Sequence, residues 1–160
     1  MTKLNSYLSL IRFYNPIGFW LLLWPGLWGL FLSDNFNIQN FTIVVLGSFL
    51  TRSLGCAIND FLDKDFDKSV ERTKNRPIAS KELSLSEAGI FIILLASFCI
   101  FLLMQTNPYT IKLVSYFAIP MIILYPLMKR FLAMPQLFLG ATFGLSLPIS
   151  YSIAESTLSL

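Results

Sequence analysis

The sequence contains no histidine, and only two of its 160 residues are cysteine. The absence of histidine excludes histidine-based catalytic triads, histidine-rich zinc sites and acid–base catalysis by imidazole. Cys56 and Cys99 provide neither a disulfide framework nor the paired spacing of a cysteine metal site. Both lie within or beside apolar segments, so we expect them to be small buried hydrophobic residues.

Charged residues are also scarce. They make up 13% of the chain, whereas 55% of the residues are hydrophobic. A soluble domain typically has about 25% charged residues. This composition excludes a soluble globular domain, a disordered tail and a nucleic-acid-binding module, and it indicates an integral membrane protein. The net charge of +3 does not point to nucleic acid, because the basic residues lie in loops beside apolar segments.

Charged residues are few because much of the chain consists of long apolar segments. A helix of about 20 apolar residues crosses a hydrocarbon core of about 30 Å. The pattern predicts an all-α, polytopic membrane bundle with five transmembrane helices, the last two joined by a tight turn. The expected spans are residues 13–32, 41–58, 88–104, 113–128 and 131–154.

The basic residues predict the orientation of these spans. If the N-terminus is cytoplasmic, every lysine and arginine except Lys112 falls on the cytoplasmic side. This asymmetry is the one that the positive-inside rule describes. We therefore expect the N-terminus and the segment 59–87 in the cytoplasm, and the C-terminal end on the opposite side.

Most acidic residues gather in one segment, between Asp60 and Glu87. At about 100° per residue, a helix that continues the second span would bring Asp63 and Asp67 within about 60° of Asp60. Asp65 would lie about 140° away and point elsewhere. Three carboxylates on one face repel one another unless a cation joins them, and such oxygen ligands suit Mg²⁺.

The acidic segment has two other possible interpretations. One is a solvated helix or loop whose charges neutralise one another in local ion pairs; the position at the end of an apolar span favours function instead. The other is a calcium loop, because Asp63, Asp65 and Asp67 have alternate spacing. That loop requires glycine at its sixth position and glutamate at its twelfth, where this chain has Lys68 and Lys74.

Two motifs follow one another at the end of the second expected span, NDFLDKDFD (59–67) and RTKNRP (72–77). They resemble the patterns N-D-x-x-D-x-x-x-D and R-T-x-x-R-P of the intramembrane aromatic prenyltransferases. The runs NPIG (15–18) and LLLWP (21–25) resemble the first helix of the branch that acts on 4-hydroxybenzoate. The run YPLMKR (125–130) resembles that branch's Y-x-x-x-K motif, and GATFG (140–144) fits its fifth helix, where the spacing of Gly140 and Gly144 predicts close helix packing.

The resemblance implies a function and a set of site residues. The implied activity is the Mg²⁺-dependent transfer of a polyprenyl group from its diphosphate to the ring of 4-hydroxybenzoate, in ubiquinone biosynthesis at a bacterial inner membrane. The implied catalytic and metal-binding residues are Asp60, Asp63 and Asp67, with Asn59 as a further metal ligand. The implied substrate-binding residues are Arg52, Asn59, Arg72, Arg76, Tyr125 and Lys129.

The resemblance extends over the whole chain but reaches only the N-terminal half, or slightly more, of the family's nine-span fold. The family has a second Asp-rich motif beyond the fifth span, and residues 1–160 do not contain it. Residues 1–160 are therefore expected to form a partial transmembrane domain: either the gene is split or truncated, or a second polypeptide supplies the rest. The alternatives are transfer to another aromatic acceptor and a non-catalytic membrane remnant.

Overall fold

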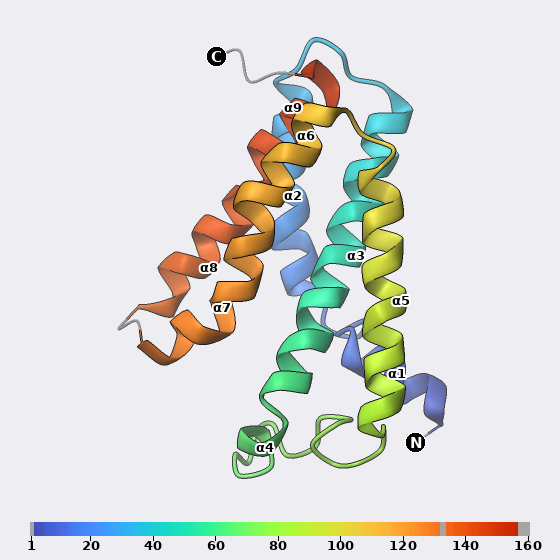
Figure 1. The fold of residues 1–160 in the computed structure, drawn as a ribbon, viewed down its shortest axis with the longest axis vertical. Helices are drawn as coiled ribbons and strands as arrows, with labels where there is room; N and C mark the ends of the chain where they lie inside the picture. Colours follow the sequence, from blue (N-terminus) through green and yellow to red (C-terminus); the bar gives the residue numbers. More distant parts are fainter. Residues whose placement is uncertain (1, 132–133, 157–160) are drawn as a thin grey trace. The chain divides into compact units, whose positions relative to one another are not determined.

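The computed structural model describes residues 2–131 and 134–156, without the side chains of residues 126–131 and 135. Every regular element in this described part is a helix, which confirms the all-α prediction (Figure 1). The elements, in chain order, are α1 (Lys3–Leu10), α2 (Ile17–Phe31), α3 (Ile38–Leu62), α4 (Lys64–Asp67), α5 (Leu85–Leu103), α6 (Pro108–Leu113), the π-helical segment η1 (Val114–Ala118), α7 (Ile119–Phe131), α8 (Pro135–Gly144) and α9 (Ser146–Glu155).

Four helical stretches are long and apolar enough to cross a membrane. They are Ile38–Leu62, Leu85–Leu103, Pro108–Tyr125 and Gln136–Glu155. The first predicted span, residues 13–32, is shorter in the structure, because the helix begins only at Ile17, directly after Pro16. The resulting 15-residue α2 has a length of about 22 Å at a rise of about 1.5 Å per residue.

Local signals in the sequence explain where several helices begin. Before α5, Ser84 and Glu87 form a reciprocal capping box: the Ser84 N–H donates to Glu87 Oε2 at 2.8 Å, and the Glu87 N–H donates to Ser84 Oγ at 3.2 Å. Before α6, Asn107 accepts a hydrogen bond from the Thr110 N–H at 2.9 Å, and Pro108 occupies the first turn.

The described helices belong to two compact units. The first unit comprises Met1–Ile17 and Leu50–Cys99, and the second comprises Gly18–Phe49 and Ile100–Leu160. The core of the first unit contains six buried hydrophobic residues contributed by α1, α3, the segment 68–84 and α5: Leu10, Ala57, Ile78, Leu83, Ala88 and Leu95. The core of the second unit is built on Leu23, Leu30 and Val44.

In the second unit, α2 and α9 approach each other closely at Gly29. A Cβ atom at this position would collide with the carbonyl oxygen of Leu147 and with Ser150 Oγ, so only glycine fits there. The close packing predicted for Gly140 and Gly144 is not found among the described residues, none of which comes within 4 Å of a Cβ atom built at either glycine.

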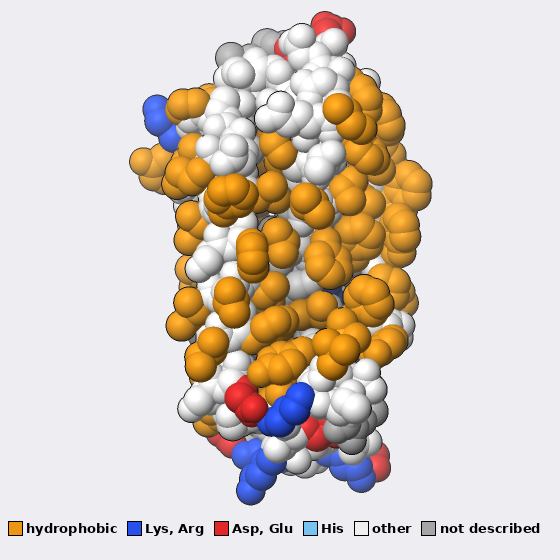
Figure 2. All heavy atoms as spheres, turned by 90° about the vertical axis from the view of Figure 1, so that its right-hand side faces the viewer, with side chains coloured by type: hydrophobic (Ala, Val, Ile, Leu, Met, Phe, Trp, Pro, Cys, Tyr) orange, Lys and Arg blue, Asp and Glu red, His pale blue; other side chains and the backbone are white. Residues whose placement is uncertain are grey.

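The exposed surface of α5 is apolar, as expected for a helix in contact with lipid. Figure 2 shows hydrophobic side chains over most of this face, with charged side chains gathered near the beginning of α5. Ile90, Ile93 and Phe98 are each more than half exposed, which is unusual for a helix of a soluble protein. The structure therefore supports the prediction of a membrane protein.

Candidate functional site: a buried carboxylate–guanidinium network

The acidic segment is bent rather than continuous. The helix α3 ends at Leu62, the bend falls at Asp63, and α4 follows at Lys64–Asp67. The predicted single helix through residue 67 is therefore wrong at this point. Backbone hydrogen bonds from Asp63 to Asn59 (2.9 Å) and from Asp67 to Asp63 (2.8 Å) keep the chain coiled across the bend.

The burial of the four aspartates divides them into two groups. Asp60, Asp63 and Asp67 are at most 4% exposed. Asp65 is exposed and forms an ion pair with Lys68 at 2.8 Å. The hydrogen bond from Lys68 holds the pKa of Asp65 below its ordinary value. This arrangement confirms the prediction that Asp65 points away from the other three aspartates.

Two arginines surround the buried carboxylates. Arg12 Nη2 lies 2.7 and 2.9 Å from the two carboxylate oxygens of Asp60. Arg76 Nη1 lies 3.0 Å from Asp60 Oδ1 and 2.7 Å from Asp67 Oδ2. Arg76 thus joins two carboxylates that are separated by seven positions in the chain. We call Arg12, Asp60, Arg76 and Asp67 the charge network.

The segment after α4 holds Arg76 in place. Its residues Pro77, Ile78, Ala79 and Leu83 are buried, and Ile78 and Leu83 belong to the core of the first unit. The Thr73 hydroxyl donates to the Asp67 carbonyl oxygen at 3.1 Å. Figure 1 shows this segment connecting the end of α4 with the beginning of α5. The segment is therefore anchored to the core through Ile78 and Leu83. Its Lys74–Glu71 ion pair is exposed to solvent.

The end of α1 holds Arg12 in place. The N–H of Phe13 donates to the Leu8 carbonyl oxygen at 2.9 Å, and the N–H of Arg12 donates to that of Ser9 at 3.0 Å. This is the Schellman pattern, which places Arg12 at a left-handed position with φ 59°, where glycine is usual. The α1 helix is itself fixed by a hydrogen bond of 2.8 Å from the Ser6 hydroxyl to Glu82.

Arg12 belongs to this site although no sequence motif predicts it. The sequence pattern identifies it only as one of the positive charges expected on the cytoplasmic side. It lies 48 positions before Asp60, so no helical spacing connects the two residues. The sequence feature that could have indicated Arg12 is its position, as a basic residue between a short helix and the first long apolar segment.

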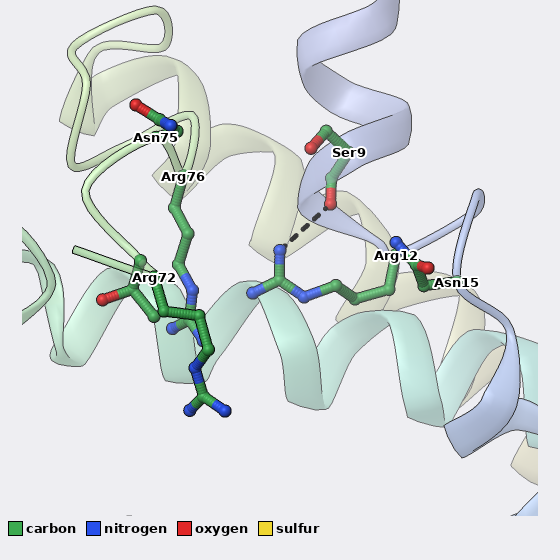
Figure 3. A pocket seen from close by; sticks show the side chains of 7 residues that line it. Ser9, Arg12, Asn15, Arg72, Asn75 and Arg76 are labelled. Atoms are coloured by element: carbon green, nitrogen blue, oxygen red, sulfur yellow. Dashed lines mark hydrogen bonds between the residues drawn. The ribbon is translucent and has the colours of Figure 1, made fainter. Parts of the chain in front are cut away.

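A polar pocket of about 310 Å³ lies beside the charge network. Three of its seven lining residues are arginines, and none is acidic. Figure 3 shows the arginine side chains together with Ser9, Asn15 and Asn75. The complete lining is Ser9, Arg12, Asn15, Arg72, Thr73, Asn75 and Arg76. Arginine side chains present geometrically fixed N–H donors that suit phosphate oxygens, so this pocket is chemically fitted to an anion.

The structure places the remaining predicted site residues as follows. Asn59 lies on α3 beside Asp60, and its buried Oδ1 has no hydrogen-bond partner among the described residues. Arg52 is half-buried on α3. Tyr125 is half-buried on α7, in the second unit. Lys129 also belongs to α7, but its side chain lies outside the described residues.

The predicted aspartates do not form a ready-made metal cage. In the described part of the chain, no three acidic, cysteine or histidine side chains are grouped closely enough to hold an ion. The donor chemistry nevertheless fits Mg²⁺, which commonly uses one or two carboxylates together with substrate phosphates. The unsatisfied Asn59 Oδ1 is an oxygen of the kind that such an ion accepts. Asn59, Asp60, Asp63 and Asp67 thus supply oxygen donors of the type that Mg²⁺ binds, and a metal held by one or two of these carboxylates would need further oxygens.

Comparison with protein families identifies the class of this fold and site. The UbiA prenyltransferase family matches residues 22–160. The chain belongs to this family, which confirms the resemblance found in the sequence.

Individual relatives agree with this assignment. The chain is 44% identical to a 4-hydroxybenzoate octaprenyltransferase of Polynucleobacter asymbioticus, over 94% of the chain and 53% of the relative. It is 41% identical to an enzyme of the same name from Vibrio atlanticus, over 98% of the chain and 56% of the relative. The chain therefore spans about half the length of these curated relatives.

Solved structures show the same fold. A digeranylgeranylglyceryl phosphate synthase superposes with a TM-score of 0.78 at 25% identity, over 94% of this chain and 53% of the synthase. A UbiA homologue from Archaeoglobus fulgidus, bound to GPP and Mg²⁺, superposes with a TM-score of 0.76 at 19% identity, over 97% of this chain and 56% of the homologue.

Proposed function

We propose that this chain supplies the diphosphate-binding part of a prenyltransferase that moves a polyprenyl group from its diphosphate to the ring of 4-hydroxybenzoate. The observation that carries this proposal is the charge network, whose buried carboxylates adjoin an arginine-lined pocket. The proposal is supported by membership of the UbiA family and by relatives named 4-hydroxybenzoate octaprenyltransferase. The product of this reaction is a precursor of ubiquinone.

The residues divide the chemistry between them. Asn59, Asp60, Asp63 and Asp67 would hold Mg²⁺, which supplies charge stabilisation to a departing diphosphate. Arg72 is exposed and lines the pocket, so its guanidinium can bind phosphate oxygens as the carbon–oxygen bond of the prenyl diphosphate breaks. The carbon ortho to the phenol oxygen of 4-hydroxybenzoate then forms a bond to the allylic carbon and loses its proton. Apolar helices of the complete fold would exclude water, which would otherwise capture the cation.

Activity should require the part of the family fold that residues 1–160 do not contain. This chain supplies one carboxylate cluster, whereas clamping a diphosphate between metal ions needs carboxylates on both sides of it. We expect the 160-residue chain alone to form no product. We expect transfer when it is co-expressed with the remaining half of the Polynucleobacter asymbioticus relative. The assay measures prenylated product from octaprenyl diphosphate, Mg²⁺ and labelled 4-hydroxybenzoate.

Each outcome of this assay distinguishes a different possibility. Product from the 160-residue chain alone would contradict the need for a second half. No product from the co-expressed halves, with both present in the membrane, would contradict transfer to this acceptor. Replacing 4-hydroxybenzoate by a naphthoate in the same membranes then tests the alternative acceptor, and inactivity with both acceptors would favour a non-catalytic membrane protein.

The proposed site should face the cytoplasm. In a chain whose Cys56 and Cys99 are replaced by alanine, Ser69→Cys should resist a membrane-impermeant maleimide in spheroplasts and react after permeabilisation. Lys112→Cys is the matched control on the opposite side and should react in intact spheroplasts, because both positions are exposed in the structure. The reverse labelling pattern would overturn the orientation and place the N-terminus outside the cytoplasm.

A further inference from the structure

Arg12 forms an ion pair with Asp60, the most buried member of the charge network. Asp60 is 1% exposed, and both of its carboxylate oxygens accept hydrogen bonds from Arg12 Nη2. Arg76 approaches Oδ1 of the same carboxylate at 3.0 Å. A metal ion that binds Asp60 must therefore compete with two guanidinium groups for the same oxygens. Arg76 also has a second carboxylate partner, whereas Asp60 is the acidic partner of Arg12.

The charges of the four network members balance one another; Asp63, which is also buried, is not among them. Asp60 and Asp67 contribute two negative charges, and Arg12 and Arg76 contribute two positive charges. A divalent cation that entered alone would bring two further positive charges into a buried region, where opposing charges interact strongly. An anion that entered with the cation would restore the balance and would offer the displaced guanidinium new acceptors in the adjoining pocket, which Arg12 also lines.

The backbone of Arg12 gives independent support for a specific role. Its φ of 59° is a left-handed conformation that costs a non-glycine residue free energy. Glycine would end α1 there without this cost. The side chain that glycine lacks is the one that reaches Asp60 from the end of α1. The left-handed position is therefore occupied by one of the two side chains that neutralise the buried carboxylate.

From these observations we infer that Arg12 makes metal binding conditional on diphosphate. In the absence of diphosphate, Arg12 holds Asp60 and keeps the metal affinity low. When diphosphate and metal bind together, Arg12 transfers its hydrogen bonds from the carboxylate to phosphate oxygens and frees Asp60. Arg12 is thus a positioning residue that prevents the site from filling with metal alone. The inference depends on the proposed function for the identity of the two ligands.

The test measures metal binding and needs no catalysis. The detergent-solubilised 160-residue chain is dialysed to equilibrium against radioactive Mn²⁺, with and without inorganic diphosphate, and free Mn²⁺ is measured in the protein-free compartment. For the parent chain we expect diphosphate to lower the dissociation constant for Mn²⁺ by about tenfold or more, which is a typical coupling between two ligands. For Arg12→Gln we expect tighter Mn²⁺ binding without diphosphate and a coupling reduced to about twofold or less.

Two matched variants separate charge from position. Arg12→Lys keeps the positive charge at the same backbone conformation, so Mn²⁺ binding without diphosphate should remain as weak as in the parent. Lys3→Gln removes one positive charge from α1, the helix that precedes Arg12, where Lys3 pairs with half-buried Glu87 instead of the network. We expect Lys3→Gln to bind Mn²⁺ like the parent, with the full effect of diphosphate.

The outcomes distinguish this inference from the proposed function. Unchanged or weaker Mn²⁺ binding by Arg12→Gln without diphosphate would overturn the role of Arg12, and so would equal tightening by Lys3→Gln. Tight Mn²⁺ binding by the parent without diphosphate would also overturn it, independently of whether any variant folds. By contrast, no Mn²⁺ binding to the parent even with diphosphate would contradict the metal-binding part of the proposed function as well.

Discussion

Replacing Asp67 by asparagine should reduce prenyl transfer by at least about 100-fold in the enzyme assembled from both halves. Asp67 is 3% exposed and shares Arg76 with Asp60, so its carboxylate belongs to the charge network. Removing one preorganised electrostatic group from a catalytic site costs about 100- to 1,000-fold in rate. The measurement is the initial rate of prenylation of labelled 4-hydroxybenzoate with saturating Mg²⁺.

Asp65→Asn is the matched control for this prediction. Asp65 lies two positions away on the same short helix, but it is exposed and pairs with Lys68. Exposed ion pairs contribute at most about 1 kcal/mol, so this variant should retain activity within about twofold of the parent. Equal losses at positions 65 and 67, in variants that unfold at the same temperature as the parent, would contradict the division of the aspartates by burial.

Replacing Arg76 by methionine should produce the largest loss of stability. The substitution leaves Asp67 without its guanidinium partner and leaves Asp60 with Arg12 alone. Removing one member of a buried ion pair costs about 3–5 kcal/mol, because an uncompensated charge stays buried. The expected result is a corresponding decrease in the free energy of unfolding, measured by denaturant titration in detergent.

Two comparisons test the cause of this loss. Lys74→Met removes a charge from the same segment, but Lys74 pairs at 2.6 Å with Glu71, whose side chain is 87% exposed, so the change should cost at most about 1 kcal/mol. The double variant Arg76→Met with Asp67→Asn should recover part of the lost stability, because the unpaired charge is then absent. A double variant less stable than Arg76→Met would show that Arg76 acts through packing instead of through the carboxylate.

The amino-acid sequence by itself determined the class of the protein. A chain with few charges and long apolar segments can satisfy its backbone in lipid only as helices or a closed barrel, and the segment lengths select helices. Local signals also act within a few residues, as the Ser84–Glu87 capping box shows at the beginning of α5. The pattern around Asp60 was sufficient to assign the family, since its motif residues are close together in the chain.

The tertiary structure alone decided how the charges are paired. Helical spacing predicted that Asp60 and Asp67 share a face, whereas only the structure shows that Arg76 joins their carboxylates. Arg12 reaches Asp60 across 48 positions because α1 is fixed against the segment before α5 by Ser6 and Glu82. The residues adjacent to Arg12 and to Asp60 in the sequence do not indicate that these two side chains meet. A buried carboxylate is unstable without a compensating positive charge. The packing of separate helices determines which basic side chain lies close enough to provide it.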